Sequence, residues 1–199
     1  MRRILKYILL KFRTKFVFRY YRVRSYFIGY VMTKTLTMKS QISFQAPVRF
    51  CGAGQVEIFD EVKFGYYDAP RMGSGEILIQ ARDVDSLVSI GVGTAFSNNV
   101  SLIARNSIKI GKGCLVGDGV RVVDADFHCI QSELRHVSSG EVAPVSIGDN
   151  VWLGSGVTVL KGVTVGGNSV IAAGAVVCRD IPMGVVAGGV PAKVINELT

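Results

Sequence analysis

The chain lacks acidic residues over its first quarter, and it has few charges and few prolines overall. No Asp or Glu precedes Glu57, 19% of the 199 residues are charged, and five are proline. A disordered chain would be richer in charge and proline, so we expect a packed fold. The 23 glycines and the 49% of hydrophobic residues favour a turn-rich, all-β domain over a helical bundle.

The excess positive charge is confined to the N-terminal end. Residues 1–56 carry twelve Lys or Arg, whereas the remainder carries eleven basic and fifteen acidic side chains, so the net charge of +8 divides into +12 and −4. This asymmetry predicts a basic arm, residues 1–41, joined to an ordinary domain, residues 42–199. Such arms are typical of proteins that meet a membrane surface or nucleic acid.

The cysteines, histidines and apolar runs are too sparse or too scattered for several classes of protein. The four cysteines form no C-x-x-C pair and have no partnering His pair, which indicates neither a zinc site nor a disulfide framework. We therefore expect free thiols in a reducing compartment. Lys and Arg interrupt the apolar runs near the N-terminus, which argues against a secretion signal or a transmembrane helix and favours the cytoplasm.

What is present is a repeat of six residues. From Ile147 onward, Ile, Leu or Val occupies every sixth position, and a second series four residues later is small or apolar. The first series is Ile147, Leu153, Val159, Val165, Ile171 and Val177; the second is Val151, Val157, Val163, Ser169, Ala175 and Ile181. Six residues suit one short strand and one corner, and such strands bury their inward face only by stacking in coils.

The repeat therefore predicts a β-solenoid over residues 42–182. Upstream, the same period appears at Ile90, Phe96, Leu102 and Ile108, then shifts by two to Ile110, Val116 and Val122. One stretch, residues 124–146, carries no period and is expected to be an inserted loop. The alternative is a β-sandwich, but its turns would recur every 8 to 12 residues.

Four segments carry a resemblance to a known family. They are residues 147–154 (IGDNVWLG), 162–166 (GVTVG), 178–182 (CRDIP) and 189–193 (GVPAK). Together they resemble the hexapeptide-repeat acyltransferases, in particular the branch with galactoside and polysaccharide or O-antigen O-acetyltransferases. The resemblance implies a left-handed parallel β-helix, a homotrimer, acetyl-CoA as the donor, and active sites between neighbouring subunits.

The insertion contains both histidines of the chain. His128 follows Asp124-Ala125-Asp126-Phe127, and His136 comes eight residues later. Acetyl transfer to a hydroxyl needs a base near neutrality, which an imidazole supplies. In the family a His at the position of His128 is the general base, although Pro often follows it where this chain has Cys129. Asp126 or Asp124 can orient the imidazole, or can be a solvated turn carboxylate.

Cys129 raises the alternative of a covalent mechanism. Side chains adjacent in sequence rarely converge on one point, and a reactive Cys needs an electropositive pocket. We therefore expect direct attack in a ternary complex, with a backbone N–H near Ser155 polarising the thioester, a role implied by the resemblance. His136 is expected to be an ordinary loop residue.

The family resemblance also assigns the donor groove. Its positions here are Trp152, Ser155, Gly156, Ala173, Gly174, Cys178, Arg179 and Lys193. Small residues allow close approach of the pantetheine arm, and Arg179 and Lys193 suit phosphates. Ala173 and Gly174 are also what the repeat itself demands. Trp152 falls at an outward position, where an exposed ring calls for a ligand or a subunit partner.

The acceptor pocket is marked less clearly. Asn98 and Asn99 fall where the family has an acceptor-facing Asn, but Asn is also common at corners because it tolerates the left-handed conformation. Glu133, Arg135 and Glu141 in the insertion can shape the pocket, with no motif to rank them.

The basic arm reads as an imperfect amphipathic helix. Lys11, Lys15, Arg19 and Arg22 form a helical stripe, which we place opposite Phe12, Phe16 and Tyr20. Such a helix fits peripheral binding to an anionic membrane, and it also fits packing on the end of the solenoid. No nucleic-acid recognition fold accompanies it, so nucleic acid is not an expected partner.

The predicted function is an acetyl-CoA-dependent O-acetyltransferase for a sugar hydroxyl, in surface polysaccharide biosynthesis. Acetylation of serine, an antibiotic or an amino sugar is the alternative within acyl transfer, and a non-catalytic platform is the alternative outside it. A γ-type carbonic anhydrase would need three zinc-binding histidines, and the chain has two. No metal is expected.

Overall fold

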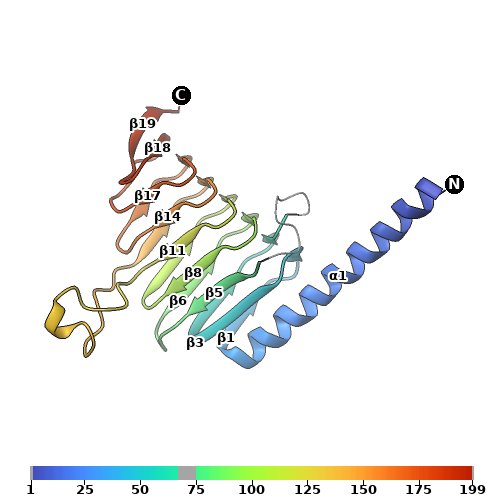
Figure 1. Cartoon of the computed structure of the whole chain (residues 1–199), viewed down its shortest axis with the longest axis horizontal. Helices are drawn as coiled ribbons and strands as arrows, with labels where there is room; N and C mark the ends of the chain where they lie inside the picture. The colour runs from blue at the N-terminus through green and yellow to red at the C-terminus, as the bar shows by residue number, and fades with distance from the viewer. Residues whose placement is uncertain (1, 67–74, 199) are drawn as a thin grey trace.

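The domain is a three-sided coil of short parallel strands that begins behind a long helix (Figure 1). The computed structural model describes residues 2–66 and 75–198, with side chains except those of residues 2–14, 28 and 34. Helix α1 spans Arg2–Met32, and strand β1 (Thr33–Met38) follows it. The predicted fold class is confirmed: the domain is a left-handed parallel β-helix with a helical N-terminal arm.

Each turn of the coil contributes one strand to each of three faces. Strand β3 (Val48–Ile58) bends across an edge, so that residues 48–51 pair with β5 on face C and residues 55–58 pair with β6 on face A. Face A continues as β6 (Leu87–Ile90), β9 (Ser107–Ile110), β12 (Val145–Ile147) and β15 (Thr164–Val165), with β1 beside β3. Face C continues as β5 (Ile77–Ala81), β8 (Ser101–Ala104), β11 (Arg121–Val123), β14 (Thr158–Val159) and β17 (Val176–Val177).

Face B closes the prism and carries the last strands. It consists of β2 (Ser43–Phe44), β4 (Lys63–Phe64), β7 (Ala95–Phe96), β10 (Leu115–Val116), β13 (Trp152–Leu153), β16 (Val170–Ile171) and β18 (Val185–Gly188). The final strand, β19 (Lys193–Glu197), turns back and pairs antiparallel with β18. The chain visits the faces in the order A, B, C, so an insertion after a face-C strand emerges at the edge between faces C and A.

The six-residue series forms the core. Leu153, Val159, Val165, Ile171 and Val177 are all fully buried, and successive coils pair them in register, as with Leu153 and Ile171. The second series is also buried, including its one polar member, Ser169. Its hydroxyl donates to the carbonyl of Pro182 at 2.8 Å and accepts from the N–H of Val185, so no buried polar group is left unpaired there.

The two-residue shift of the period has a structural cause. On face A, β9 is four residues long and points both Ile108 and Ile110 inward, whereas β15 is two residues long. The longer strand makes a wider turn, and Ile90 pairs with Ile110, its counterpart one turn on. In the N-terminal turns a column of rings fills face B, with centroids of Phe44 and Phe64 5.4 Å apart and those of Phe64 and Phe96 5.3 Å apart.

Helix α1 closes the N-terminal end of the coil with its C-terminal half. Ser25 and Gly29 are buried there, and the Ser25 hydroxyl accepts a hydrogen bond from the backbone N–H of Val48 at 3.1 Å. Arg24 pairs with Glu76 at 2.8 Å. Figure 1 shows the N-terminal half of α1 running away from the strands. The arm therefore packs on the solenoid over part of its length and projects over the rest.

Candidate active site

The insertion between β11 and β12 is a two-legged loop at the C–A edge. The legs pair through the backbone: the N–H of Asp126 donates to the carbonyl of Glu141 at 2.8 Å, and the N–H of Cys129 donates to that of Ser138 at 3.3 Å. A short 3-10 turn, Ser132–Leu134, forms the tip. Gly140 allows the legs to approach, because a Cβ there would lie 2.4 Å from the carbonyl oxygens of Asp126 and His128.

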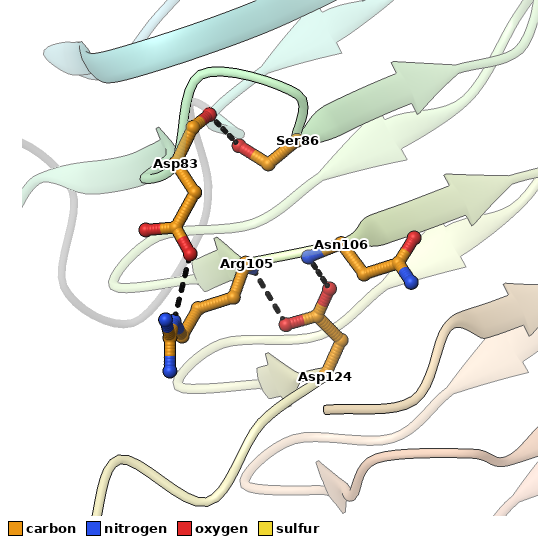
Figure 2. Close-up of polar contacts among 5 residues, drawn as sticks. All are labelled: Asp83, Ser86, Arg105, Asn106 and Asp124. Atoms are coloured by element: carbon orange, nitrogen blue, oxygen red, sulfur yellow. Dashed lines mark hydrogen bonds and ion pairs between the residues drawn. The ribbon is translucent and has the colours of Figure 1, made fainter. Parts of the chain in front are cut away.

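Asp124 fixes the base of the insertion to the preceding turn (Figure 2). It is fully buried, and its two carboxylate oxygens accept the backbone N–H groups of Arg105 and Asn106, each at 2.8 Å. The Arg105 side chain donates in turn to Asp83 at 2.9 Å. Asp124 therefore serves the corner of the coil, rather than the imidazole of His128.

Lys161 ties the two legs of the insertion together from the next turn of the coil. Its Nζ lies 3.2 Å from the carboxylate of Asp126 on one leg and 3.1 Å from that of Glu141 on the other. These two hydrogen bonds raise the pKa of Lys161, and the bond to Glu141 has the larger effect. The carboxylate of Asp126, predicted as the partner of His128, thus binds Lys161 in this structure.

His128 is oriented by the backbone of its own loop. Its Nδ1 lies 3.1 Å from the carbonyl oxygen of Arg135. A carbonyl only accepts hydrogen bonds, so Nδ1 carries the hydrogen of the neutral ring, and Nε2 holds the lone pair. The ring is exposed, with Nε2 as its basic atom. This arrangement suits a general base that takes a proton from a bound hydroxyl.

The other residues of the loop have separate partners. The Cys129 thiol donates to the amide oxygen of Gln131 at 2.6 Å, and the guanidinium of Arg135 donates to the carbonyl of Ile130 at 3.0 Å. Glu133 accepts from the neighbouring Ser132 hydroxyl, which lowers its pKa. The Phe127 ring lies under the guanidinium of Arg82, 5.2 Å from its centroid.

Most of the predicted donor and acceptor residues lie along the B–C edge instead. This edge stacks one corner above another through backbone hydrogen bonds, from Gly119 to Asn98, Gly156 to Asp118 and Gly174 to Ser155, at 2.8 to 3.0 Å. It carries the predicted residues Asn98, Asn99, Ser155, Gly156, Ala173 and Gly174. Gly174 has φ +72°, and no other atom lies within 4 Å of its ideal Cβ position, so a ligand can approach the backbone there.

The two asparagines also have roles in the corner. Asn99 adopts the left-handed conformation, with φ 57°, and its amide donates to the carboxylate of Asp118 at 3.0 Å. Asn98 is buried. Their assignment to the acceptor pocket stays a prediction.

The remaining predicted donor residues are divided between two places. Trp152 is half exposed on face B, in β13 next to the B–C edge. Lys193 begins β19 and pairs with Gly188, where face B ends at the same edge. Cys178 and Arg179 follow β17 and therefore lie at the C–A edge, two turns after the insertion, where both are exposed.

No sequence pattern marks Arg82, Gly140 or Lys161, and no motif ranks Arg135 within the insertion. Lys161 and Gly140 fall within ordinary corner or loop segments, so neither breaks a pattern. The contribution of Arg135 to His128 comes from its backbone carbonyl, which every residue type has. Within the described residues, His128 and the small-residue corners thus occupy different edges of one chain, separated by face C.

Comparisons with known proteins agree with this arrangement of coils. Residues 144–179 match the family model described as bacterial transferase hexapeptide, with six repeats. The chain carries the hexapeptide repeat. The chain is 39% identical over 113 residues to galactoside O-acetyltransferase of Escherichia coli, and the aligned region covers 57% of this chain and 55% of that protein. The predicted resemblance to hexapeptide-repeat acyltransferases is confirmed.

Two solved structures resemble this chain as well. One is a hexapeptide-repeat-containing acetyltransferase from Vibrio cholerae complexed with acetyl coenzyme A, with TM-score 0.54 and 33% identity over 56% of this chain and 61% of that one. The other is a polysialic acid O-acetyltransferase, with TM-score 0.63 and 25% identity over 83% of this chain and 74% of that one. The chain spans between half and three-fifths of the length of three of its curated relatives.

Proposed function

We propose that the protein is an acetyl-CoA-dependent O-acetyltransferase that modifies a sugar hydroxyl, in surface polysaccharide biosynthesis. The observation that carries the proposal is the geometry of His128, whose Nδ1 is held by the Arg135 carbonyl while Nε2 keeps the lone pair. Support also comes from the relatives, which are named for acetyl transfer to galactosides and to polysialic acid.

The reaction is a direct transfer. The acceptor oxygen attacks the thioester carbonyl while His128 Nε2 takes the hydroxyl proton, which makes the imidazole a cation. The tetrahedral intermediate then expels coenzyme A, and the imidazolium returns the proton to the leaving sulfur. A backbone N–H near Ser155 would stabilise the oxyanion. No covalent acetyl-enzyme is needed, which leaves Cys129 outside the reaction.

The site forms between copies of the chain in this proposal. His128 stands at the C–A edge, whereas Ser155, Gly156, Ala173 and Gly174 line the B–C edge. A second copy that presents its B–C edge to the insertion would bring the base and the donor together. A homotrimer satisfies this requirement for three sites at once, because the same contact repeats around a threefold axis.

The donor fits the exposed corners of the C-terminal coils. Ala173 and Gly174 are exposed and small, so the pantetheine arm can pack along the backbone. Lys193 lies at the same edge and suits a phosphate. Arg179 lies at the other edge, so in the trimer it would reach a donor bound to the neighbouring copy.

We also propose that the enzyme works beside an anionic membrane, where the basic arm would hold it near a lipid-linked acceptor. Of the described helices, none is long and apolar enough to cross a bilayer. Peripheral binding through Lys and Arg is the alternative that the charge distribution favours.

The test is acetyl transfer from radiolabelled acetyl-CoA to a panel of acceptors. We expect transfer to galactosides and oligosaccharides, and none to serine or an aminoglycoside. Arg179→Ala and Lys193→Ala should raise the KM for acetyl-CoA, because contacts to a remote phosphate are made equally before and during the reaction. Transfer to serine alone would replace the sugar proposal, and no transfer at all would favour a non-catalytic platform.

A further inference from the structure

Helix α1 turns an apolar stripe away from the solenoid. Its solenoid-facing side carries the buried Ser25 and Gly29, and the opposite side carries large side chains at helical spacing. These are Phe16, Tyr20, Val23, Phe27 and Tyr30, hereafter the α1 stripe. Phe16 is 75% exposed, Phe27 68% and Tyr30 86%. A row of exposed rings on one helix is the pattern of a binding surface, whereas single exposed apolar residues are ordinary.

The stripe is regular and is bordered by positive charge. Its members are separated by four and three residues in alternation, which keeps them on one side of a helix. In the sequence, Leu5, Leu9 and Phe12 continue the same side, although their side chains lie outside the described ones. Lys15, Arg19 and Arg22 are exposed along one flank. The basic stripe expected to lie opposite the aromatic residues therefore lies beside them.

We propose that the α1 stripe inserts into the interfacial layer of an anionic lipid bilayer, with the helix lying in the membrane plane and the solenoid outside. This inference builds on the proposed membrane arm and names the surface that makes the contact. Helices that bind this way combine Phe or Leu on one side with Lys and Arg along the border. Tyr side chains, apolar with one polar end, suit the same layer.

A bilayer is favoured over a second copy of the helix because of charge. Alternating spacing of three and four residues is also the spacing of a coiled-coil seam. In such a bundle the flanking residues of neighbouring helices meet, and here they would be Lys and Arg with no acid available, since none precedes Glu57. Anionic headgroups supply the missing negative charge, and each basic residue near them adds to binding.

A groove beside the stripe offers a place for a headgroup. It lies between α1 and the first turn of the coil, has a volume of about 810 Å³, and is lined by Phe18, Arg19, Arg22, Val23, Tyr26, Ile42, Ser43 and Phe44. Two guanidinium groups among apolar walls match a phosphate with its attached chain. Val23 belongs to both the stripe and the groove, so the two surfaces are continuous.

The experiment measures co-sedimentation of the full chain with vesicles of phosphatidylcholine mixed with phosphatidylserine, and with vesicles of phosphatidylcholine alone. The test variant is Phe16→Gln/Phe27→Gln, which removes two rings, keeps the charge and changes only exposed residues. Phe16→Leu/Phe27→Leu is the conservative counterpart. Val84→Gln is the matched control, because Val84 is 59% exposed on the solenoid.

The Gln double variant should bind the mixed vesicles at least about tenfold less tightly than the wild type, since each ring loses its apolar burial. The Leu variant and Val84→Gln should bind within about twofold of it. Arg19→Gln/Arg22→Gln should lose affinity for the mixed vesicles, with little change on phosphatidylcholine alone. No acceptor or acetyl-CoA is present, so the result is independent of whether the chain transfers acetyl groups.

Unchanged binding by the Gln double variant would overturn the proposal and leave only a charge attraction. Absence of wild-type binding would overturn it as well. If the variant instead altered the oligomeric state in sedimentation while vesicle binding stayed the same, the α1 stripe would be a contact between copies. Equal unfolding midpoints of variant and wild type would show that the fold is intact.

Discussion

The two edges that border face C are held together in different ways. At the B–C edge three successive turns repeat a backbone hydrogen bond to the turn before, as with Gly156 and Asp118. At the C–A edge the insertion interrupts that regularity: its legs pair with each other through their backbones, and the side chains of Asp124 and Lys161 tie it to the neighbouring turns. In the proposed function, the repeated edge is the surface for the donor and the irregular edge holds the proposed base. The proposal therefore assigns the scaffold and the chemistry to separate parts of the chain.

Removing the proposed base should have the largest effect. His128→Ala is expected to lower kcat by about 10² to 10⁴, the usual contribution of a positioned base, while acetyl-CoA binding stays nearly unchanged. His136→Ala is the control in the same loop. Equal losses of kcat in His128→Ala and His136→Ala would contradict the assignment of His128 as the base.

Truncating a side chain in the coil should lower the free energy of unfolding much more than truncating one in the insertion. Leu153→Ala removes a fully buried side chain and should lower the free energy of unfolding by about 2 to 5 kcal/mol. Ile130→Ala, in the loop and 71% exposed, should stay within about 0.5 kcal/mol. Denaturant unfolding of both variants measures this. A comparable loss for Ile130 would mean that its side chain is buried in the proposed contact between copies.

Lys161 tests the attachment between the edge and the insertion. Lys161→Met removes both ion pairs and should reduce kcat by up to about 10²-fold, as displacement of a catalytic group does. The unfolding midpoint should change little, because ion pairs near the protein surface contribute little to stability. Lys161→Arg should restore most of the activity. Full activity of Lys161→Met would show that the Arg135 carbonyl and the backbone pairs suffice to hold His128.

The smallest effect concerns the thiols. Burial raises the pKa of Cys51 and of Cys114, so both remain protonated at mildly alkaline pH and should alkylate slowly in the folded protein. Cys178 is exposed at the C–A edge and should react first. Mass spectrometry of timed labelling checks the order. Early labelling of Cys114 would indicate that the coil opens beside β10.

The sequence predicted the coil well because its core position recurs. Each inward residue, such as Leu153 or Val159, is one of a series, and the series identifies the strand even when it is two residues long. The wider turns were harder to predict, because a second inward residue, Ile108 beside Ile110, appears only as a shift of phase. The buried face of α1 left no signal, since Ser25 and Gly29 are small and one is polar.

The candidate site could be predicted only in part. His128 stood out because it lay in the one stretch without a period. Its partner could not be inferred, because a backbone carbonyl leaves no trace in residue types. The expected contact between Asp126 and His128 rested on their proximity in sequence. In the structure the Asp126 carboxylate forms an ion pair with Lys161 instead. A single ion pair between distant segments has no repeat to reveal it.

The most direct test of the account is complementation between two inactive variants. One is His128→Ala, which lacks the base at the C–A edge, and the other is Ala173→Trp, which blocks the small-residue corner at the B–C edge. Coexpression should restore a fraction of wild-type acetyl transfer, because some sites in mixed trimers combine an intact insertion from one copy with an intact corner from its neighbour. If mixed oligomers form and remain inactive, the base and the donor belong to the same chain, and the site does not lie between copies.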